Sequence, residues 1–114
     1  SCGGGFLVRW LSENKDKKVG RVVLVAPWLN PENNPFSDTA DFFVFDIDPE
    51  LVSRTAGVTI FNSDNDEETI HKSVQIIRDA IKDIGYKEFH NNGHFCYEDL
   101  KTVEFPELVD ECLQ

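Results

Sequence analysis

The chain has 114 residues, of which 21 are Asp or Glu and 11 are Lys or Arg, so its formal net charge is −10 at pH 7. This length predicts a single domain over residues 1–114. The negative charge argues against nucleic acids and anionic membranes as partners, because both present phosphate groups to a protein. We find no apolar run near the roughly 20 residues that a membrane helix needs, and we expect no secretory leader.

The cysteines are Cys2, Cys96 and Cys112, an odd number without a close pair. Their spacing favours neither a disulfide framework nor a zinc site. We therefore expect reduced thiols, a cytoplasmic protein, and no bound metal or other cofactor. Cys96 is expected to be a small buried residue of the core.

The first part of the chain predicts a helix, a strand and a loop. Apolar residues within 6–11 follow helical spacing, and this first helix is expected to end near Asn14. Residues 22–26 form an unbroken apolar run, which is typical of a central parallel strand. The segment 28–41 is rich in Pro and Asn and is expected to form a loop over the carboxyl edge of the sheet. Residues 42–45 are either a core segment or the apolar wall of a pocket.

The middle of the chain predicts one unit of strand, loop and helix. Residues 58–61 are β-branched or aromatic and predict a buried strand, and residues 62–66 then follow with turn-forming side chains. From Ile70 onward, apolar residues recur every three or four positions up to Gly85, where the helix is expected to stop. This order places Asp66 at the carboxyl end of a strand, where open α/β sheets carry their functional groups.

Shorter elements flank this unit on both sides. Residues 48–52 carry the pattern of a helix start, and residues 86–89 predict another strand. A turn over 91–94 follows that strand and ends in His94, and Pro106 opens a last helix. Strands that alternate with helices predict parallel strands joined by helical crossovers, and hence an α/β fold in layers.

Three polar residues stand out: Ser1 precedes a helix, Asp66 follows one strand and His94 follows the next. Their order along the chain is that of the triad in α/β-hydrolases. In such a site the serine hydroxyl attacks an acyl carbon, the histidine takes the proton, and the carboxylate holds the imidazole in the useful tautomer. Asp64 is a second candidate for the acid, and Asp66 is preferred.

Four short motifs resemble those of the small serine hydrolases typified by retinoblastoma-binding protein 9 and its bacterial relatives. They are Ser1-Cys2-Gly3-Gly4 at the nucleophile, Ser63-Asp64-Asn65-Asp66 at the acid, Gly93-His94-Phe95 at the base and Phe105-Pro106-Glu107-Leu108 at the last helix. The resemblance covers the whole chain. It implies the carboxyl-terminal portion of an α/β-hydrolase fold, with a parallel sheet between layers of helices, and a triad of Ser1, Asp66 and His94.

The chain departs from that family around the nucleophile. It lacks the early strands, the Gly-His before the family's serine, and the loop that supplies a second oxyanion-hole amide. The Cys2 amide is left as one oxyanion donor, and the loss of one donor typically costs about 100-fold to 1000-fold in rate. Glu67-Glu68-Thr69 replaces a Pro-containing stretch and adds negative charge beside Asp66. The departures imply a weak or inactive enzyme as this truncated chain stands.

The same departures predict an interaction edge. Without the neighbour that it has in the family, the strand over 22–26 presents unpaired backbone groups along one side. We expect either self-association or pairing with a missing amino-terminal half through this edge.

The leading hypothesis is a serine hydrolase that acts on small esters, thioesters or amides. One alternative is an amino-terminal-nucleophile hydrolase, in which Ser1 uses its own α-amine as the base. The alternation of strands and helices disfavours the stacked antiparallel sheets of such enzymes. The other alternative is a non-catalytic α/β interaction module. His71 and His90 are expected to be solvated under every one of these hypotheses.

Overall fold

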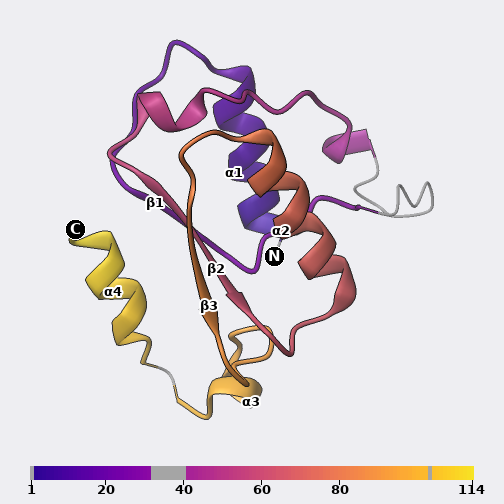
Figure 1. Ribbon diagram of the computed structural model, residues 1–114, viewed down its shortest axis with the longest axis vertical. Coiled ribbons are helices and arrows are strands. Elements are labelled where there is room, and N and C mark those ends of the chain that lie inside the picture. The colour runs from indigo at the N-terminus through magenta and orange to yellow at the C-terminus, as the bar shows by residue number, and fades with distance from the viewer. Residues whose placement is uncertain (1, 32–40, 103) are drawn as a thin grey trace.

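The computed structural model describes residues 2–31, 41–102 and 104–114, and Figure 1 shows their arrangement. The predicted nucleophile Ser1 and most of the predicted loop over 28–41 lie outside the described residues. The elements follow one another in this order, with η marking a short 3₁₀ helix: α1 (Cys2–Glu13), β1 (Val22–Val25), η1 (Asp41–Phe43), η2 (Leu51–Arg54), β2 (Val58–Ser63), α2 (Glu68–Ala80), β3 (Gly85–Phe89), α3 (Tyr97–Leu100) and α4 (Pro106–Cys112).

The strands of the described chain form one parallel sheet in the order β1-β2-β3. In this register Val22 lies opposite Val58, and Thr59 lies opposite Gly85. Every residue of β2 is buried because β2 is the central strand, whereas β1 and β3 form the two edges. The predicted α/β class, with parallel strands and flanking helices, is confirmed.

One face of the sheet carries the apolar core and is covered by α1 and α2. Side chains alternate in direction along a strand, so Val22 and Leu24 of β1 point to the same face. Figure 1 shows α1 and α2 together on one side of the strands and α4 on the other. The buried residues that the two helices contribute are Val8 and Leu11 from α1 and Ile70, Val74 and Ile77 from α2. Their spacing of three or four residues is the helical periodicity that the sequence shows.

The opposite face of the sheet holds α4 through a buried carboxylate. Glu111 is 6% exposed, its Oε1 accepts a hydrogen bond from the Thr59 hydroxyl at 2.7 Å, and its Oε2 lies 2.7 Å from Lys87 Nζ. These bonds, from Lys87 first and Thr59 second, lower the pKa of Glu111 below its ordinary 4.5. The carboxylate therefore contributes stability above pH 4.5, and that contribution is lost as the pH falls through the lowered pKa.

Some elements differ from the prediction in their bounds, and one was not predicted. β2 continues beyond the predicted strand to Ser63, and α2 ends at Ala80 instead of running to Gly85. The helix stops because Ile81 adopts extended backbone, which keeps its side chain in the core at 3% exposure. Gly85 instead begins β3, where an added Cβ would crowd Thr59 Oγ1 at 3.1 Å. The short helix α3 is not predicted.

Glycine allows the start of α1 to lie close to the segment that follows β1. An added Cβ at Gly5 would overlap the carbonyl oxygen of Trp28, and one at Gly4 would lie 2.9 Å from the Cβ of Pro27. No larger residue fits at Gly5 without a shift of backbone. This close approach brings the first turn of α1 beside Trp28, at the carboxyl end of β1.

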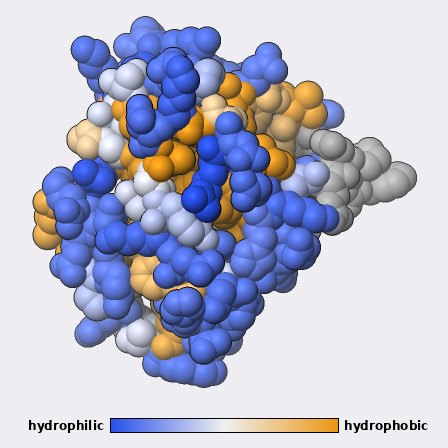
Figure 2. All heavy atoms as spheres, in the orientation of Figure 1, coloured by the Kyte–Doolittle hydropathy of each residue, from blue (hydrophilic) through white to orange (hydrophobic). Residues whose placement is uncertain are grey.

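The face of the molecule seen in Figure 2 is largely polar. Hydrophilic residues cover most of it, and apolar residues show through only in places. This agrees with the net charge of −10. None of the helices in the described part of the chain is long and apolar enough to cross a membrane.

Candidate active site

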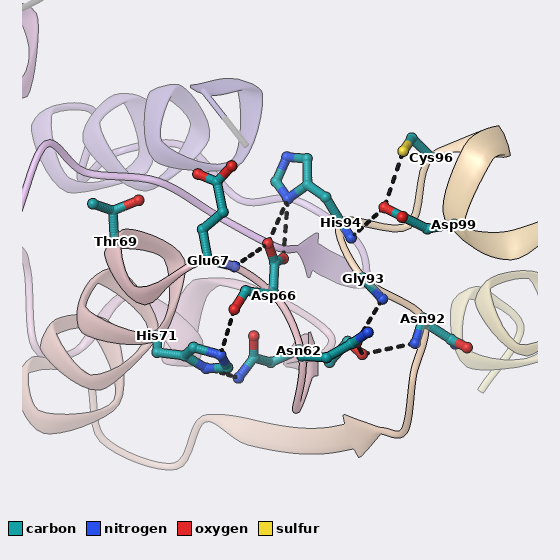
Figure 3. Close-up of polar contacts among 12 residues, drawn as sticks. Asn62, Asp66, Glu67, Thr69, His71, Asn92, Gly93, His94, Cys96 and Asp99 are labelled. Carbon is teal, nitrogen blue, oxygen red and sulfur yellow. Dashed lines mark hydrogen bonds and ion pairs between the residues drawn. The ribbon is translucent and has the colours of Figure 1, made fainter.

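Two loops meet at the carboxyl edge of the sheet, one after β2 and one after β3. Residues 63–66 end β2 and lead to α2, and residues 90–94 follow β3. Because β2 and β3 are parallel neighbours, their carboxyl ends lie side by side. The N–H of Asp64 donates to the carbonyl oxygen of Phe89 at 2.9 Å, which joins the loops where they begin. Most of the polar contacts in Figure 3 come from these two loops.

Asp66 and His94 form a close pair across the loops. The Nδ1 atom of His94 lies 3.0 Å from Oδ2 and 3.2 Å from Oδ1 of Asp66 (Figure 3). The Asp66 side chain is 1% exposed, whereas the His94 side chain is 38% exposed. A buried carboxylate accepts the Nδ1 proton, which leaves the lone pair of a neutral imidazole on Nε2. Nε2 of His94 is therefore available as a base.

A second acid–histidine pair, Asp64 and His90, lies beside the first. Asp64 Oδ2 lies 2.8 Å from His90 Nδ1, and Asp64 Oδ1 accepts a hydrogen bond from the N–H of Asn91 at 3.0 Å. The Asn91 bond, followed by the His90 bond, lowers the pKa of Asp64, and the bonded carboxylate raises the pKa of His90. His90 is exposed, as predicted, but paired. The structure places Asp66, and not the alternative Asp64, against His94.

Asn65 ties the two loops together from its place between the two acids. Its Oδ1 accepts hydrogen bonds from the Ser63 hydroxyl and from the N–H of Gly93, both at 2.8 Å. The Ser63 oxygen in turn accepts a hydrogen bond from the N–H of Asn92 at 2.9 Å. The backbone just before His94 is therefore held by side chains of the acid loop. Asn65 was not among the predicted site residues, although its place between the two acids was a usable signal.

Asp99 of α3 holds the histidine loop from its other side. Its Oδ2 accepts hydrogen bonds from the N–H of His94 at 2.8 Å and from the Cys96 thiol at 3.1 Å. The thiol bond is the first cause of the lowered pKa of Asp99, and the same bond raises the pKa of Cys96. Gly93 has a φ of +54°, and a Cβ there would overlap the Asp99 carboxylate. The prediction that Cys96 is buried in the core is wrong, because its thiol bonds to Asp99 at an exposed position.

His71 supports the acid loop from α2. Its Nε2 lies 3.0 Å from the carbonyl oxygen of Asp66, and its Nδ1 lies 3.2 Å from Asn62 Nδ2. The prediction that His71 is solvated is wrong, because its ring is half-buried between these groups. The signal in the sequence is its position next to Ile70, at the margin of the apolar face of the helix.

A cavity of about 310 Å³ opens beside His94. This volume lies at the lower end of the range typical of small-molecule sites, roughly 300–1000 Å³. The edge-on contact of Trp28 with Phe43, with ring centroids 5.2 Å apart, fixes one wall. The lining residues come from the start of α1, the end of β1, the start of α2 and the histidine loop: Cys2, Trp28, Glu67, Thr69, Ile70 and His94.

The predicted site residues are placed as follows. Asp66 and His94 are in contact, and Cys2 lines the same cavity as His94. Ser1 lies outside the described residues and directly precedes Cys2 in the chain. In the described ranges, no group of three or more His, Cys, Asp or Glu side chains is placed to hold a metal ion. Glu67, which was predicted only to add negative charge beside Asp66, lies on the cavity wall.

The arrangement is suited to move a proton at the cavity. An imidazole oriented by a buried carboxylate takes a proton at Nε2, and the carboxylate stabilises the imidazolium that forms. Asp66 is itself fixed, because its Oδ1 also accepts the N–H of Glu67 at 2.7 Å. The first residue of α1, Cys2, lines the cavity, and the first N–H groups of a helix are free to bind a negative oxygen. The His94 imidazole and the first residue of α1 thus line one cavity.

Comparison of the chain with protein-family models, with curated proteins and with solved structures finds no match in any of the three. The likeness to serine hydrolases is therefore a resemblance of short motifs. A functional proposal has to rest on the geometry of the described residues together with those motifs.

Proposed function

We propose that the chain is a serine hydrolase of weak activity, forming the carboxyl-terminal portion of an α/β-hydrolase fold, that acts on small esters, thioesters or amides. The observation that carries this proposal is the Asp66–His94 pair at the cavity. Its carboxylate is 1% exposed and lies 3.0 Å from Nδ1 of a half-exposed imidazole. A carboxylate is costly to bury, and here the histidine and the Glu67 N–H offset that cost. Such a pair orients a histidine that acts as a general base.

The position of the pair in the fold also supports the proposal. Asp66 follows β2 and His94 follows β3, so both lie at the carboxyl edge of a parallel sheet. Open α/β sheets bind their ligands along this edge. The chain order of Ser1, Asp66 and His94 matches that of α/β-hydrolases.

Ser1 is the nucleophile in the proposed reaction. Its hydroxyl oxygen forms a bond to the acyl carbon while its proton passes to Nε2 of His94, and that proton then passes to the leaving oxygen, sulfur or nitrogen. Water attacks the resulting acyl ester with Nε2 again as the base, which releases the acid and restores Ser1. The Cys2 N–H, at the start of α1, donates to the negative oxygen of each tetrahedral intermediate.

Turnover of p-nitrophenyl acetate by matched variants tests this proposal. We expect Ser1→Ala and His94→Ala to reduce the rate to that of the buffer, because each removes a group that reacts directly. His90→Ala is the control, since it removes the neighbouring imidazole of the exposed pair and is expected to keep the rate within about twofold. Retained turnover in the folded Ser1→Ala protein would contradict the proposal.

A second candidate, a non-catalytic interaction module, is favoured by the edge of the sheet. β1 pairs with β2 on one side only among the described strands. The N–H of Val22 donates to the carbonyl oxygen of Gly57, just before β2, and that of Ala26 donates to Phe61. The alternation along the strand therefore turns the N–H groups of Val23 and Val25 to the outer side. Such an edge can take up a further strand, and we propose self-association through it.

Light scattering tests whether the chain self-associates through the outer edge of β1. Val23→Pro removes an outward N–H and no bond to β2, so it is expected to shift a self-associating chain to the monomer. Val44→Lys is the control for nonspecific apolar contact, because Val44 is 75% exposed and lies outside the sheet. A wild-type chain that is monomeric at all concentrations would contradict self-association.

A further inference from the structure

Glu67 sets the charge of the cavity beside His94. It is the residue before the first turn of α2, and its own N–H is bound to Asp66 Oδ1 at 2.7 Å. Its carboxylate makes no capping hydrogen bond to the helix. Figure 3 shows the Glu67 carboxylate and the His94 ring on the same side of the Asp66 carboxylate, which His94 contacts through Nδ1. Glu67 therefore presents its charge to the cavity and not to its own helix.

The rest of the cavity wall suits a cation as well. Trp28 contributes an aromatic ring, held in place by its edge-on contact with Phe43. A ring face attracts an ammonium group, and a carboxylate binds one through charge-assisted hydrogen bonds. Among the described residues that line the cavity there is no Lys or Arg to compensate Glu67. The net charge of −10 adds a long-range attraction for cations.

The N-terminal ends of two helices favour a negative charge near the cavity, in contrast to Glu67. Cys2 begins α1, and Glu67 precedes α2, so the positive ends of both helix dipoles lie near the cavity. Each dipole end corresponds to about half an elementary charge and is effective only over the first turn. The α1 end serves the negative oxygen of the proposed reaction. The full charge of Glu67 outweighs the half charge of the α2 end, so the part of the cavity beside α2 favours a cation.

We infer that the substrate of this site carries a primary ammonium group, as an amino ester or amino amide does, and that Glu67 and Trp28 bind that group while the acyl carbon lies at His94. Glu67 is a specificity-determining residue in this scheme and takes no part in the proton transfers. The inference rests on the proposed hydrolase for its reaction, but the binding of an ammonium group can be measured without turnover.

Binding of benzylammonium and of its neutral counterpart benzyl alcohol, followed by NMR, tests the inference on the intact chain. We expect benzylammonium to shift the Trp28 indole and His94 imidazole signals and to bind at least tenfold more tightly than the alcohol. Glu67→Gln is expected to remove this preference. Glu68→Gln is the matched control, because Glu68 is the exposed neighbour in the first turn of α2 and does not line the cavity. Equal binding of amine and alcohol, or an unchanged preference in Glu67→Gln, would overturn the inference.

The esters of glycine and of acetic acid extend the test to turnover. We expect the chain to hydrolyse the p-nitrophenyl ester of glycine about tenfold faster than the acetate, after subtraction of the uncatalysed rate of each, and Glu67→Gln to equalise the two. Equal rates for both esters, each abolished by His94→Ala, would overturn the substrate class and leave the hydrolase standing. Absence of turnover for both esters, with selective binding of benzylammonium intact, would overturn the hydrolase and leave an ammonium-binding site.

Discussion

The two acid–histidine pairs come from the same two loops and differ in their surroundings. Asp64 and His90 have side chains that are 41% and 73% exposed, and their ring and carboxylate meet at 2.8 Å. Asp66 and His94 meet at the longer distance of 3.0 Å, but the Asp66 side chain is only 1% exposed and His94 lines a cavity. The shorter contact is thus at the solvated pair. Burial of the acid and access to a cavity, and not the contact distance, mark the second pair as the one suited to chemistry.

The two pairs also differ in what holds them. The Asp64–His90 pair depends on its own contact and on the N–H of Asn91. His94 is held from both sides, because the N–H of Gly93 donates to Asn65 Oδ1 and its own N–H donates to Asp99 Oδ2. Preorganised geometry matters for catalysis because a small displacement of a base greatly lowers the reaction rate. Substitutions in each pair test whether the buried, scaffolded pair and the solvated pair differ in function.

The largest effect is expected from exchanging the two acids for amides. Asp66→Asn keeps the shape of the side chain but offers His94 an amide, which favours the wrong tautomer, and comparable changes in triads cost about 10,000-fold. Asp64→Asn makes the same exchange in the exposed pair and is expected to change turnover of p-nitrophenyl acetate by less than about threefold. Equal losses in the two variants would mean that the pairs are not functionally distinct.

The next effect concerns the packing of α1 beside the cavity that His94 lines. Gly5→Ala places a Cβ against the carbonyl oxygen of Trp28, and such overpacking typically costs about 1–3 kcal/mol of unfolding free energy. Gly3→Ala is the control, because a Cβ there meets nothing within 4 Å and alanine favours a helix by up to about 1 kcal/mol. Urea unfolding of both variants measures the two free energies. A loss in Gly3→Ala as large as that in Gly5→Ala would contradict the close approach of α1 to Trp28.

A smaller effect is expected from the scaffold between the pairs. Asn65→Ala removes the acceptor for the Ser63 hydroxyl and for the N–H of Gly93, and leaving such a group unpaired costs about 1–3 kcal/mol. We expect a lower midpoint in urea and about a tenfold loss of ester turnover, because the histidine loop loosens. Full activity together with unchanged stability would show that Asn65 does not position His94.

The smallest effect concerns the charge of the exposed pair. The hydrogen bond from His90 to Asp64 raises the pKa of His90 above its ordinary 6.5. The stabilisation from His90 is thus complete below pH 6.5 and is lost as the pH rises through the raised pKa, and that from Asp64 is present above pH 3.8 and is lost as the pH falls through the lowered pKa. NMR titration of the His90 ring is expected to show a higher pKa in the wild type than in Asp64→Asn. Identical titration curves would mean that the pair does not form in solution.

Much of the fold could be predicted from the sequence because its elements carry strong periodic signals. The unbroken apolar run at 22–26 and the helical stripe from Ile70 to Ile77 are both local patterns of apolar residues, and both elements are present. The end of α2 could not be predicted, because Ile81 satisfies the apolar period in extended backbone as well as in a helix. The contact of α4 with the sheet could not be predicted either. From the sequence alone Glu111 is typical of the exposed face of a helix, and only the fold brings Thr59 and Lys87 to it.

The candidate site was predictable only where neighbouring strands fix the geometry. Asp66 and His94 follow adjacent parallel strands, so their contact follows from topology. The choice between Asp64 and Asp66 depends on which side chain turns inward at the end of β2, and composition does not reveal that. The part played by Glu67 depends on a cavity formed by α1 and α2 together, which no local pattern encodes.

The most direct test of the central claim is mass spectrometry of the intact chain after exposure to a fluorophosphonate, with the modified residue mapped by fragmentation. We predict one adduct, on Ser1, that forms in the wild type and in Asp64→Asn but not in Asp66→Asn. An adduct on Cys2, or no adduct on a folded chain in which His94 still contacts Asp66, would contradict it.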